Sequence, residues 1–354
     1  MTSYSNALAP LGVLYGAATR MRRGLYHAGV FRIHQIAEPV ISVGNITTGG
    51  TGKTPLVQWI ARAVASEGKR ACILTRGYGR KSSHNRVIVS DGESILADEK
   101  AAGDEPLLLA EKLLGLAAVI SDANRVSAAN WARENLASEV FILDDGFQYL
   151  RLARELNILC IDATNPWGGD RLLPGGRLRE PLAEIKRADC TVITRADQAP
   201  GIELLESRIA QLTGNRPILR SSVNTIGLRP LHRNKTDANA DRQTTPRGPF
   251  AAFCGIGNPQ SFFTQLSRDG HTLSYSRAFP DHHRYKQQDV DEVIDEASRR
   301  GAGALVTTDK DAVKLRALRF DIPCYVVEIE IKVDKENRLR EIINAAIRAK
   351  PKTP

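Results

Sequence analysis

The segment Pro39–Pro55, PVISVGNITTGGTGKTP, constrains the fold of this chain more than any other. An apolar run at 40–43 enters a glycine-rich turn, and an apolar helical pattern follows at 56–60. Strand, glycine-rich loop and helix, in that order, are the context in which a phosphate-binding loop is credible. Glycines let successive backbone N–H groups curl around an anion, and the new helix adds the positive end of its dipole.

The end of this loop carries side chains suited to a nucleoside triphosphate with Mg²⁺. Lys53 is expected to reach the β- and γ-phosphates, and the Thr54 hydroxyl is expected to bind Mg²⁺. The usual pattern, G-x-x-x-x-G-K-[ST], begins with glycine, whereas this chain has Thr47 there. The alternative is an ordinary glycine-rich turn. The remaining nucleotide contacts are predicted at Gly49, Gly50, Thr51 and Gly52.

Length and charge set broad bounds. A chain of 354 residues suggests about two domains. Its net charge of +9 favours an anionic partner, although a basic surface kept for solubility explains the charge equally well. The cysteines are far apart without a C-x-x-C pair, so we expect buried, reduced thiols. They are Cys72, Cys160, Cys190, Cys254 and Cys324.

Short apolar runs alternate with helical patterns from residue 40 to about 225. The runs are mostly unbroken, as in a parallel sheet covered on both faces. We expect strands at 40–43, 71–75, 87–90, 118–121, 140–144, 157–162 and 190–194, and helices at 55–67, 105–115, 124–136 and 202–212. This pattern predicts a doubly wound, mostly parallel α/β domain, which binds ligands at the C-terminal ends of its strands.

Composition divides the rest of the chain. A polar stretch at 232–248 without apolar periodicity is expected to be a linker or loop. It separates a phosphate-loop core at 39–231 from a second, smaller α/β domain at 249–345. That domain is expected to have strands at 250–254, 272–276, 304–308 and 324–329, with helices at 260–268, 287–299 and 309–316.

The N-terminal segment, 1–38, has its own character. Small and apolar residues fill 7–18, a stretch too short to span a bilayer, which needs about 20 residues. Arg20, Arg22 and Arg23 follow this stretch, whereas the basic residues of a signal peptide precede its apolar part. An amphipathic helix on an anionic membrane fits this composition. A helix packed on the protein body is the alternative.

Two acidic residues, Asp144 and Asp145, end the apolar run at 140–144. Carboxylates opposite a phosphate loop are the oxygen ligands that Mg²⁺ needs. Adjacent residues of a strand point in opposite directions, so one is expected to meet the metal and the other its waters or the acceptor. The alternative is a solvated Asp-Asp-Gly turn.

Three further segments carry candidate site residues. Asp104 opens a helix, where it could be an N-cap or a carboxylate that accepts a proton from an attacking hydroxyl. His282 lies in FPDHHRY, either as a titratable site residue or as half of a surface histidine pair. The arginines of the loop 165–181 could clamp phosphates, unless this is simply a surface loop.

Together these segments resemble the tetraacyldisaccharide 4′-kinase family of lipid A biosynthesis, from Pro39 to about Leu315. The combination is far more specific than a lone phosphate-loop motif, and the family's loop also departs from the general pattern at the Thr47 position. The motifs are GNITTGGTGKTP, TRGYGR, GDEP, DDGFQ, WGGDRLLPGGRLREP, GIGNPQSFF, FPDHHRY and TTDKDAVKL.

The resemblance implies an ATP- and Mg²⁺-dependent kinase that phosphorylates the 4′-hydroxyl of a tetra-acylated glucosamine disaccharide 1-phosphate, giving lipid IVA. It implies a location at the cytoplasmic face of a Gram-negative inner membrane, peripheral or N-terminally anchored. By position, Asp104 matches the family's acceptor-side base, and His282 matches the partner that orients this carboxylate or shares its proton after domain closure. Lys53 and Thr54 match the phosphate loop, Asp144 and Asp145 the metal-binding acids, and Arg125, Arg179 and Glu180 lie in family-like motifs assigned to the nucleotide.

Three rival functions are weaker. A switch of the partition-ATPase type needs a second lysine where this chain has Thr48. A membrane-associated GTPase needs N-K-x-D, whereas residues 194–197 read Thr-Arg-Ala-Asp. Binding of nucleic acid is suggested by charge alone, without a supporting motif. We therefore expect a lipid substrate and an anionic membrane surface as partners, without nucleic acid or an obligate protein partner.

Overall fold

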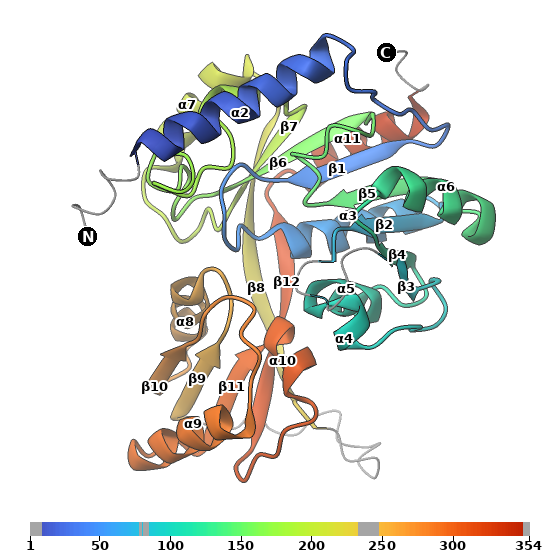
Figure 1. Ribbon diagram of the computed structural model, residues 1–354. Helices are drawn as coiled ribbons and strands as arrows, with labels where there is room; N and C mark the ends of the chain where they lie inside the picture. Colours follow the sequence, from blue (N-terminus) through green and yellow to red (C-terminus); the bar gives the residue numbers. More distant parts are fainter. Residues whose placement is uncertain (1–8, 78–79, 81–84, 233–247, 350–354) are drawn as a thin grey trace. The chain divides into compact units, whose positions relative to one another are not determined.

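The computed structural model describes residues 9–77, 80, 85–232 and 248–349. Its chain divides into two compact units, Met1–Ser222 with Ile331–Pro354, and Val223–Glu330 (Figure 1). The chain passes from one unit to the other within the strands β8 and β12. The polar linker expected at 232–248 lies almost wholly outside the described residues, as do Tyr78 and Gly79 of the TRGYGR motif.

The first unit is built on a sheet with the order β8-β7-β6-β1-β5-β2-β4-β3. Neighbouring strands run parallel, except that β3 is antiparallel to β4. The strands are β1 (Val40–Gly44), β2 (Ala71–Thr75), β3 (Val87–Ser90), β4 (Ala117–Ser121), β5 (Val140–Asp144), β6 (Leu156–Asp162), β7 (Cys190–Thr194) and β8 (Ile218–Pro230). The predicted α/β class is confirmed.

Both faces of this sheet are covered. Leu74 and Leu143 pack with the buried side of helix α6, while the alternating Ile73 and Ile142 are also fully buried. Such burial on two faces explains why the strands are continuous apolar runs. The helices of the unit are α2 (Ala9–His27), α3 (Lys53–Ser66), α4 (Glu99–Ala102), α5 (Asp104–Lys112), α6 (Arg125–Leu136), α7 (Ile202–Thr213) and α11 (Glu336–Arg348), with the 3₁₀ helix η1 (Leu182–Arg187).

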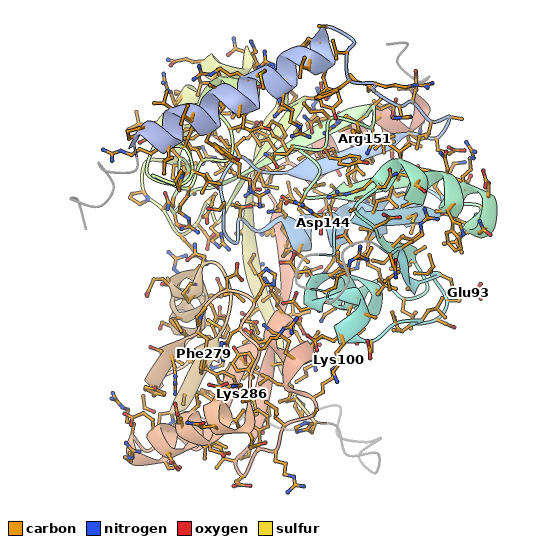
Figure 2. All side chains as sticks on the ribbon, viewed as in Figure 1. Glu93, Lys100, Asp144, Arg151, Phe279 and Lys286 are labelled. Carbon is orange, nitrogen blue, oxygen red and sulfur yellow. The ribbon has the colours of Figure 1, made fainter. Side chains whose placement is uncertain are left out.

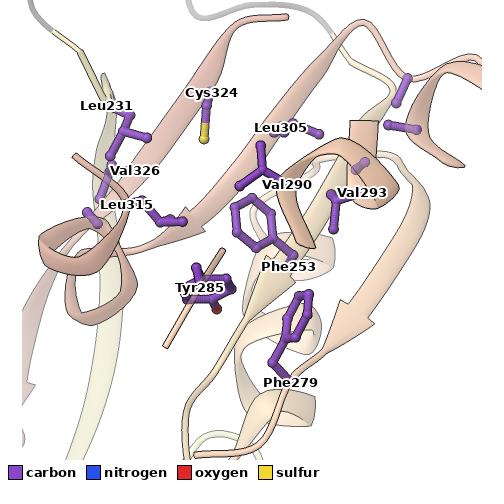
Figure 3. Packing of buried hydrophobic residues seen from close by; sticks show 14 residues of the cluster. Leu231, Phe253, Phe279, Tyr285, Val290, Val293, Leu305, Leu315, Cys324 and Val326 are labelled. Carbon is purple, nitrogen blue, oxygen red and sulfur yellow. The ribbon is translucent and has the colours of Figure 1, made fainter. Parts of the chain in front are cut away.

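The second unit is a smaller parallel sheet with the order β10-β9-β11-β12. Phe253 packs with Val290 and Val293 of α9 on one face (Figure 3). On the other face, Phe250 packs with Phe262 of α8. The elements are β9 (Phe250–Cys254), α8 (Pro259–Arg268), β10 (Leu273–Ala278), α9 (Gln287–Arg299), β11 (Ala304–Thr308), α10 (Asp309–Leu315) and β12 (Cys324–Val333).

The structure differs from the sequence-based expectations in several elements and in the bounds of the two units. Strand β8 and helix α11 were not expected, and α5 ends at Lys112 instead of continuing to 115. The chain leaves the helix at its C-cap residue, Leu113, which has φ of −120°. The two units also differ from the expected domain bounds, since the first unit ends at Ser222 and regains 331–354, where α11 packs on β1 and α3.

Helix α2 occupies the N-terminal region in which a helix was expected. Gly12 and Gly16 are its buried residues, and a Cβ atom on Gly16 would lie 2.6 Å from the Leu172 side chain, so the helix packs closely on the loop 165–181. Other positions face outward, including Val13 at 70% and Leu14 at 66% exposure. Packing on the protein body and an exposed apolar surface therefore coexist in one helix.

Among the described residues, no helix combines the length and apolar character needed to cross a membrane. All five cysteines are free and buried, as the sequence predicted.

Candidate functional site

The glycine-rich loop joins β1 directly to α3, whose first residue is Lys53. Gly52 has φ of 74°, and a Cβ atom there would lie 3.3 Å from the Thr194 side chain, so both conformation and space favour glycine. The Thr194 hydroxyl donates a hydrogen bond to the Thr51 carbonyl at 2.9 Å. Thr47 has no left-handed conformation and therefore does not require the glycine of the general pattern. The predicted strand–loop–helix context is present.

Lys53 is surrounded by oxygen atoms that fix its position. Its Nζ donates to Asn45 Oδ1 at 3.2 Å and lies 3.4 Å from Asp145 Oδ1. Asn45 is buried and its amide donates to the Thr47 carbonyl at 2.7 Å. Gln148 donates to the Asn45 carbonyl at 2.9 Å, which joins the loop to the end of β5. Asn45 and Gln148 were not among the predicted site residues, although they lie in the motifs GNITTGGTGKTP and DDGFQ.

The adjacent acids Asp144 and Asp145 have opposite electrostatic environments (Figure 2 labels Asp144). Burial, followed by the charges of Glu105 and Asp145, raises the pKa of Asp144 to about 7. Burial acts on Asp145 too, but Lys53 and Arg179 together hold the pKa of its carboxyl well below the usual range. Arg179 Nη1 lies 2.7 Å from Asp145 Oδ2. Asp145 is thus held in its ionised form, whereas burial and the acidic neighbours favour the protonated form of Asp144.

The acidic charge at the end of β5 is suited to a cation. Asp144 is buried, and Glu105 at the start of α5 is close enough to act on it electrostatically. In the described part of the chain, no three His, Cys, Asp or Glu side chains gather to hold a metal by themselves. Mg²⁺ commonly binds through one or two carboxylates, substrate phosphates and waters, so two acids beside a phosphate loop fit it. Glu105 belongs to the GDEP motif, but the sequence predicted no role for it.

The arginine-rich loop 165–181 packs directly on the glycine-rich loop. Thr47 and Leu178 form an isolated antiparallel bridge, and the Thr48 N–H donates to the Arg177 carbonyl at 2.7 Å. The Arg179 N–H donates to the Ile46 carbonyl, also at 2.7 Å. These backbone contacts place the Arg179 guanidinium next to Asp145. Because the two residues are 34 positions apart in the sequence, the sequence alone could not predict this contact.

Arg125 and Glu180, both assigned to the nucleotide by resemblance, are buried in different surroundings. Arg125 begins α6 and its guanidinium lies 4.6 Å from the Tyr149 ring centroid. Burial lowers the pKa of Arg125. Glu180 is ion-paired with Arg187, and burial raises the pKa of Glu180 despite that partner. Their contacts with a nucleotide stay predictions.

Asp104 begins α5 but does not cap it. The N-cap residue is Gly103, and no side chain makes a capping hydrogen bond there. The Asp104 Oδ1 atom accepts from the N–H of the next residue, Glu105, at 2.9 Å. A capping side chain instead accepts from the N–H of the second or third helical residue. The capping interpretation of Asp104 is therefore wrong, and its role as a base stays a prediction.

The histidine pair lies in the second unit and its members differ. His283 stacks on Phe279, with ring centroids 4.7 Å apart, and its Nε2 lies 3.1 Å from Asp289 Oδ2. His282 has φ of 60°, and its Nε2 lies 3.3 Å from Lys310 Nζ. His283 is thus fixed by ring packing and a carboxylate, whereas His282 faces an ammonium group.

The fold and the loop define a P-loop protein of the nucleotide-binding α/β class. The family model described as tetraacyldisaccharide-1-P 4′-kinase matches residues 4–348. Because the match covers nearly the whole chain, this chain belongs to that family.

Curated relatives and a solved structure support the same family membership. A tetraacyldisaccharide 4′-kinase of Geobacter metallireducens is 44% identical over 320 residues, covering 87% of this chain and 88% of the relative. The enzyme of that name from Desulfotalea psychrophila is 39% identical over 321 residues, covering 89% of each. The structure of LpxK from Aquifex aeolicus in complex with ATP is similar with a TM-score of 0.75 and 33% identity, covering 97% of this chain and 99% of that one.

Proposed function

We propose that this chain transfers the γ-phosphate of ATP to the 4′-hydroxyl of a tetra-acylated glucosamine disaccharide 1-phosphate, forming the lipid A precursor lipid IVA. The proposal rests on family membership and on one structural observation, the phosphate loop whose Lys53 is held between Asn45 and Asp145. The Aquifex aeolicus relative, solved with ATP, supports ATP as the donor.

Nucleotide binding would use the backbone of Gly49–Gly52 and the Lys53 ammonium, which meets the β- and γ-phosphates. Thr51 supports this assignment, because its hydroxyl oxygen is buried without a hydrogen-bond partner among the described residues. Arg179, with Arg125, would add positive charge near the transferred group. Placing fixed cations where negative charge develops is the largest single contribution in many enzymes.

Mg²⁺ would be held by the Thr54 hydroxyl and by Asp144 and Asp145, with phosphate oxygens completing its ligands. When bound, it supplies charge neutralisation on the β–γ bridge. The pKa of Asp144 is raised to about 7 by burial and by the negative charges of Glu105 and Asp145. A bound cation would offset these negative charges and favour the ionised form of Asp144. A residue at a metal site is usually deprotonated on binding, so this acid would release its proton.

A sugar hydroxyl is a poor nucleophile and must lose its proton as it attacks. Asp104 would accept that proton, and His282 would orient the carboxylate or share the proton. Correct positioning of acceptor and donor would supply much of the remaining rate. These roles are proposals from the family resemblance.

The N-terminal helix would place the enzyme beside its lipid, at the cytoplasmic face of a Gram-negative inner membrane. The exposed apolar side chains of α2 support this, with Val13 and Leu14 each about two-thirds exposed. Arg20 and Arg22, exposed on the same helix, would each add on the order of 1 kcal/mol near anionic lipid. Deleting 1–23 should weaken liposome binding and raise the KM for lipid.

Such a deletion should also disturb the nucleotide site somewhat, since α2 contacts it indirectly. Arg23 is ion-paired with Glu184, and Arg22 Nη2 donates to the Gln148 carbonyl at 3.2 Å. Substitutions on the exposed face of α2 therefore test membrane binding more cleanly than truncation.

The deciding experiment is incubation with γ-labelled ATP and a panel of acceptors that includes the disaccharide 1-phosphate. Label should enter only the 4′-position of the lipid. Hydrolysis of ATP without labelled lipid would instead favour a P-loop ATPase switch. Label in another acceptor would show a different kinase.

A further inference from the structure

The loop that carries His282 holds an ammonium group against the histidine ring. The Nζ atom of Lys310 lies 3.3 Å from Nε2 of His282 and 3.1 Å from Oδ1 of Asp281. The Lys310 side chain is 16% exposed and the His282 side chain 23%. These contacts are therefore partly shielded from solvent, and all three residues belong to the second unit.

Lys310 and His282 are connected through the buried side chain of Asp311 and the backbone of Gly255. Asp311, beside Lys310 on α10, is fully buried and lies 3.0 Å from the Lys314 ammonium. Asp311 Oδ2 also accepts from the Gly255 N–H at 3.0 Å, while the Gly255 carbonyl accepts from the His282 N–H at 3.2 Å. One glycine thus connects the histidine loop to the helix that carries Lys310, which restricts how far their side chains can separate.

An ammonium group has three donors and no acceptor. A hydrogen bond from Lys310 to Nε2 therefore requires a lone pair on that nitrogen. We infer that Lys310 holds His282 as a neutral imidazole with its proton on Nδ1. A second proton, on Nε2, would break this bond and bring two cations together.

The charges around the ring determine how strongly the neutral form of His282 is favoured. Asp281 would favour an imidazolium, but its Oδ2 lies 4.0 Å from Nε2 and its other oxygen is ion-paired with Lys310. The other charged residues of α10 form ion pairs of their own, Asp309 with Arg229 at 2.8 Å and Asp311 with Lys314.

The consequence rests on the proposed function, in which His282 serves the Asp104 carboxylate. A ring fixed in the Nδ1–H form offers one hydrogen-bond donor and keeps Nε2 engaged with Lys310. This selects between the two roles open to His282: the histidine orients the carboxylate, and the proton of the sugar hydroxyl stays on Asp104. Lys310 is then a positioning residue that acts through His282.

The tautomer can be observed directly in the full-length protein labelled with ¹⁵N-histidine. Long-range ¹H–¹⁵N spectra separate the two neutral tautomers and the imidazolium, and His282→Gln assigns the signal. The wild type should show the Nδ1–H form at neutral pH. Lys310→Met and Lys310→Gln should shift the population toward the Nε2–H form or the imidazolium. Arg229→Met, which removes a neighbouring cation from Asp309, should leave the signal unchanged.

Kinetics test the consequence separately. Lys310→Met should lower kcat about tenfold with KM values for ATP and lipid within about twofold, and Lys310→Arg should restore part of the loss. An Nε2–H signal in the wild type, or an unchanged signal in both Lys310 variants, would overturn the inference. Full kcat in His282→Gln would instead overturn the proposed role of His282 while leaving its tautomer established.

Discussion

Each unit of this protein contains a pair of adjacent titratable residues. The two members of a pair differ in pKa in the first unit and in side-chain contacts in the second. Asp144 and Asp145 in the first unit are separated by electrostatics, because burial raises one pKa to about 7 while Lys53 and Arg179 lower the other. In the second unit the separation is geometric. His283 is fixed by a stacked ring and Asp289, and its neighbour faces Lys310.

This difference shows what an adjacent pair can and cannot reveal in a sequence. Two carboxylates at the end of a strand indicate a cation site, whichever of the two ionises more readily. Two histidines in a loop indicate only that an imidazole is present and do not indicate what it does. In both cases the role of each member depends on side chains far away in sequence, such as Arg179, which lies 34 residues from Asp145.

The largest expected effect comes from removing the cation that holds Asp145. Lys53→Ala should lower kcat/KM for phosphoryl transfer at least about 10³-fold, because it removes both the proposed phosphate ligand and a partner of Asp145. Initial rates with labelled ATP measure this. Lys69→Ala, which breaks a surface ion pair with Glu139, is the matched control and should keep its activity. Near-normal turnover of the Lys53 variant would remove the phosphate-loop mechanism.

The next effect concerns the proposed base. Asp104→Ala should lower kcat about 10²–10³-fold and leave ATP affinity almost unchanged, since the carboxylate is proposed to act on the acceptor. Asp98→Ala is a matched control, because Asp98 does cap a helix, accepting from the Ala101 N–H at 2.9 Å. The control should lose about 0.5–2 kcal/mol of stability and keep its kcat. If the Asp104 variant behaved like this control, the base assignment would be wrong.

Stability against pH separates the two acids directly. In metal-free protein, the folded-state pKa of Asp144 is above its unfolded value, so this group destabilises the fold as pH rises from about 4 through 7. Asp144→Asn should therefore stabilise the protein at pH 8, by on the order of 4 kcal/mol at most at about 1.4 kcal/mol per pKa unit.

Asp145→Asn should do the opposite. The lowered pKa of Asp145 contributes stability above the unfolded value near 4 that is lost as pH falls through the folded pKa. Denaturant titrations with a chelator at pH 5.5, 7 and 8.5 compare the variants. Equal pH dependence in the two variants would show that the acids are not electrostatically distinct.

The smallest effect concerns the surface of α2. Leu14→Ser should raise the KM for lipid several-fold and reduce flotation with anionic liposomes, while the KM for ATP stays the same. Leu204 on α7 is 78% exposed and provides the matched control, Leu204→Ser. Equal flotation of the two variants would show that α2 only packs on the protein body.

Much of the fold could be predicted because fully buried parallel strands are continuous apolar runs, as in β1 and β5. Strand β8 was missed because most of its residues are partly buried or exposed and it contains no continuous apolar run. Helix α11 was missed because only three of its residues, Leu339, Ile343 and Ala346, are buried in a charged sequence.

The candidate site was predictable where its chemistry is local, as in the glycine-rich loop and the two acids. Its distant partners were not. The bond from Gln148 to Asn45 spans 103 residues, and Lys310 reaches His282 across 28. Such contacts depend on how strands and loops approach in three dimensions. The prediction that Asp104 caps its helix was wrong for a different reason. Residue type alone does not show from which N–H group a carboxylate accepts a hydrogen bond.

The central proposal is that Asp104 accepts the proton of the sugar hydroxyl and that His282 orients this carboxylate. A double-mutant cycle of Asp104→Asn and His282→Gln, measured as kcat with saturating ATP and lipid, tests it most directly. The account predicts that the double variant is scarcely slower than Asp104→Asn alone, with His283→Gln in the same background as a control that changes only stability. Losses that multiply independently would contradict it.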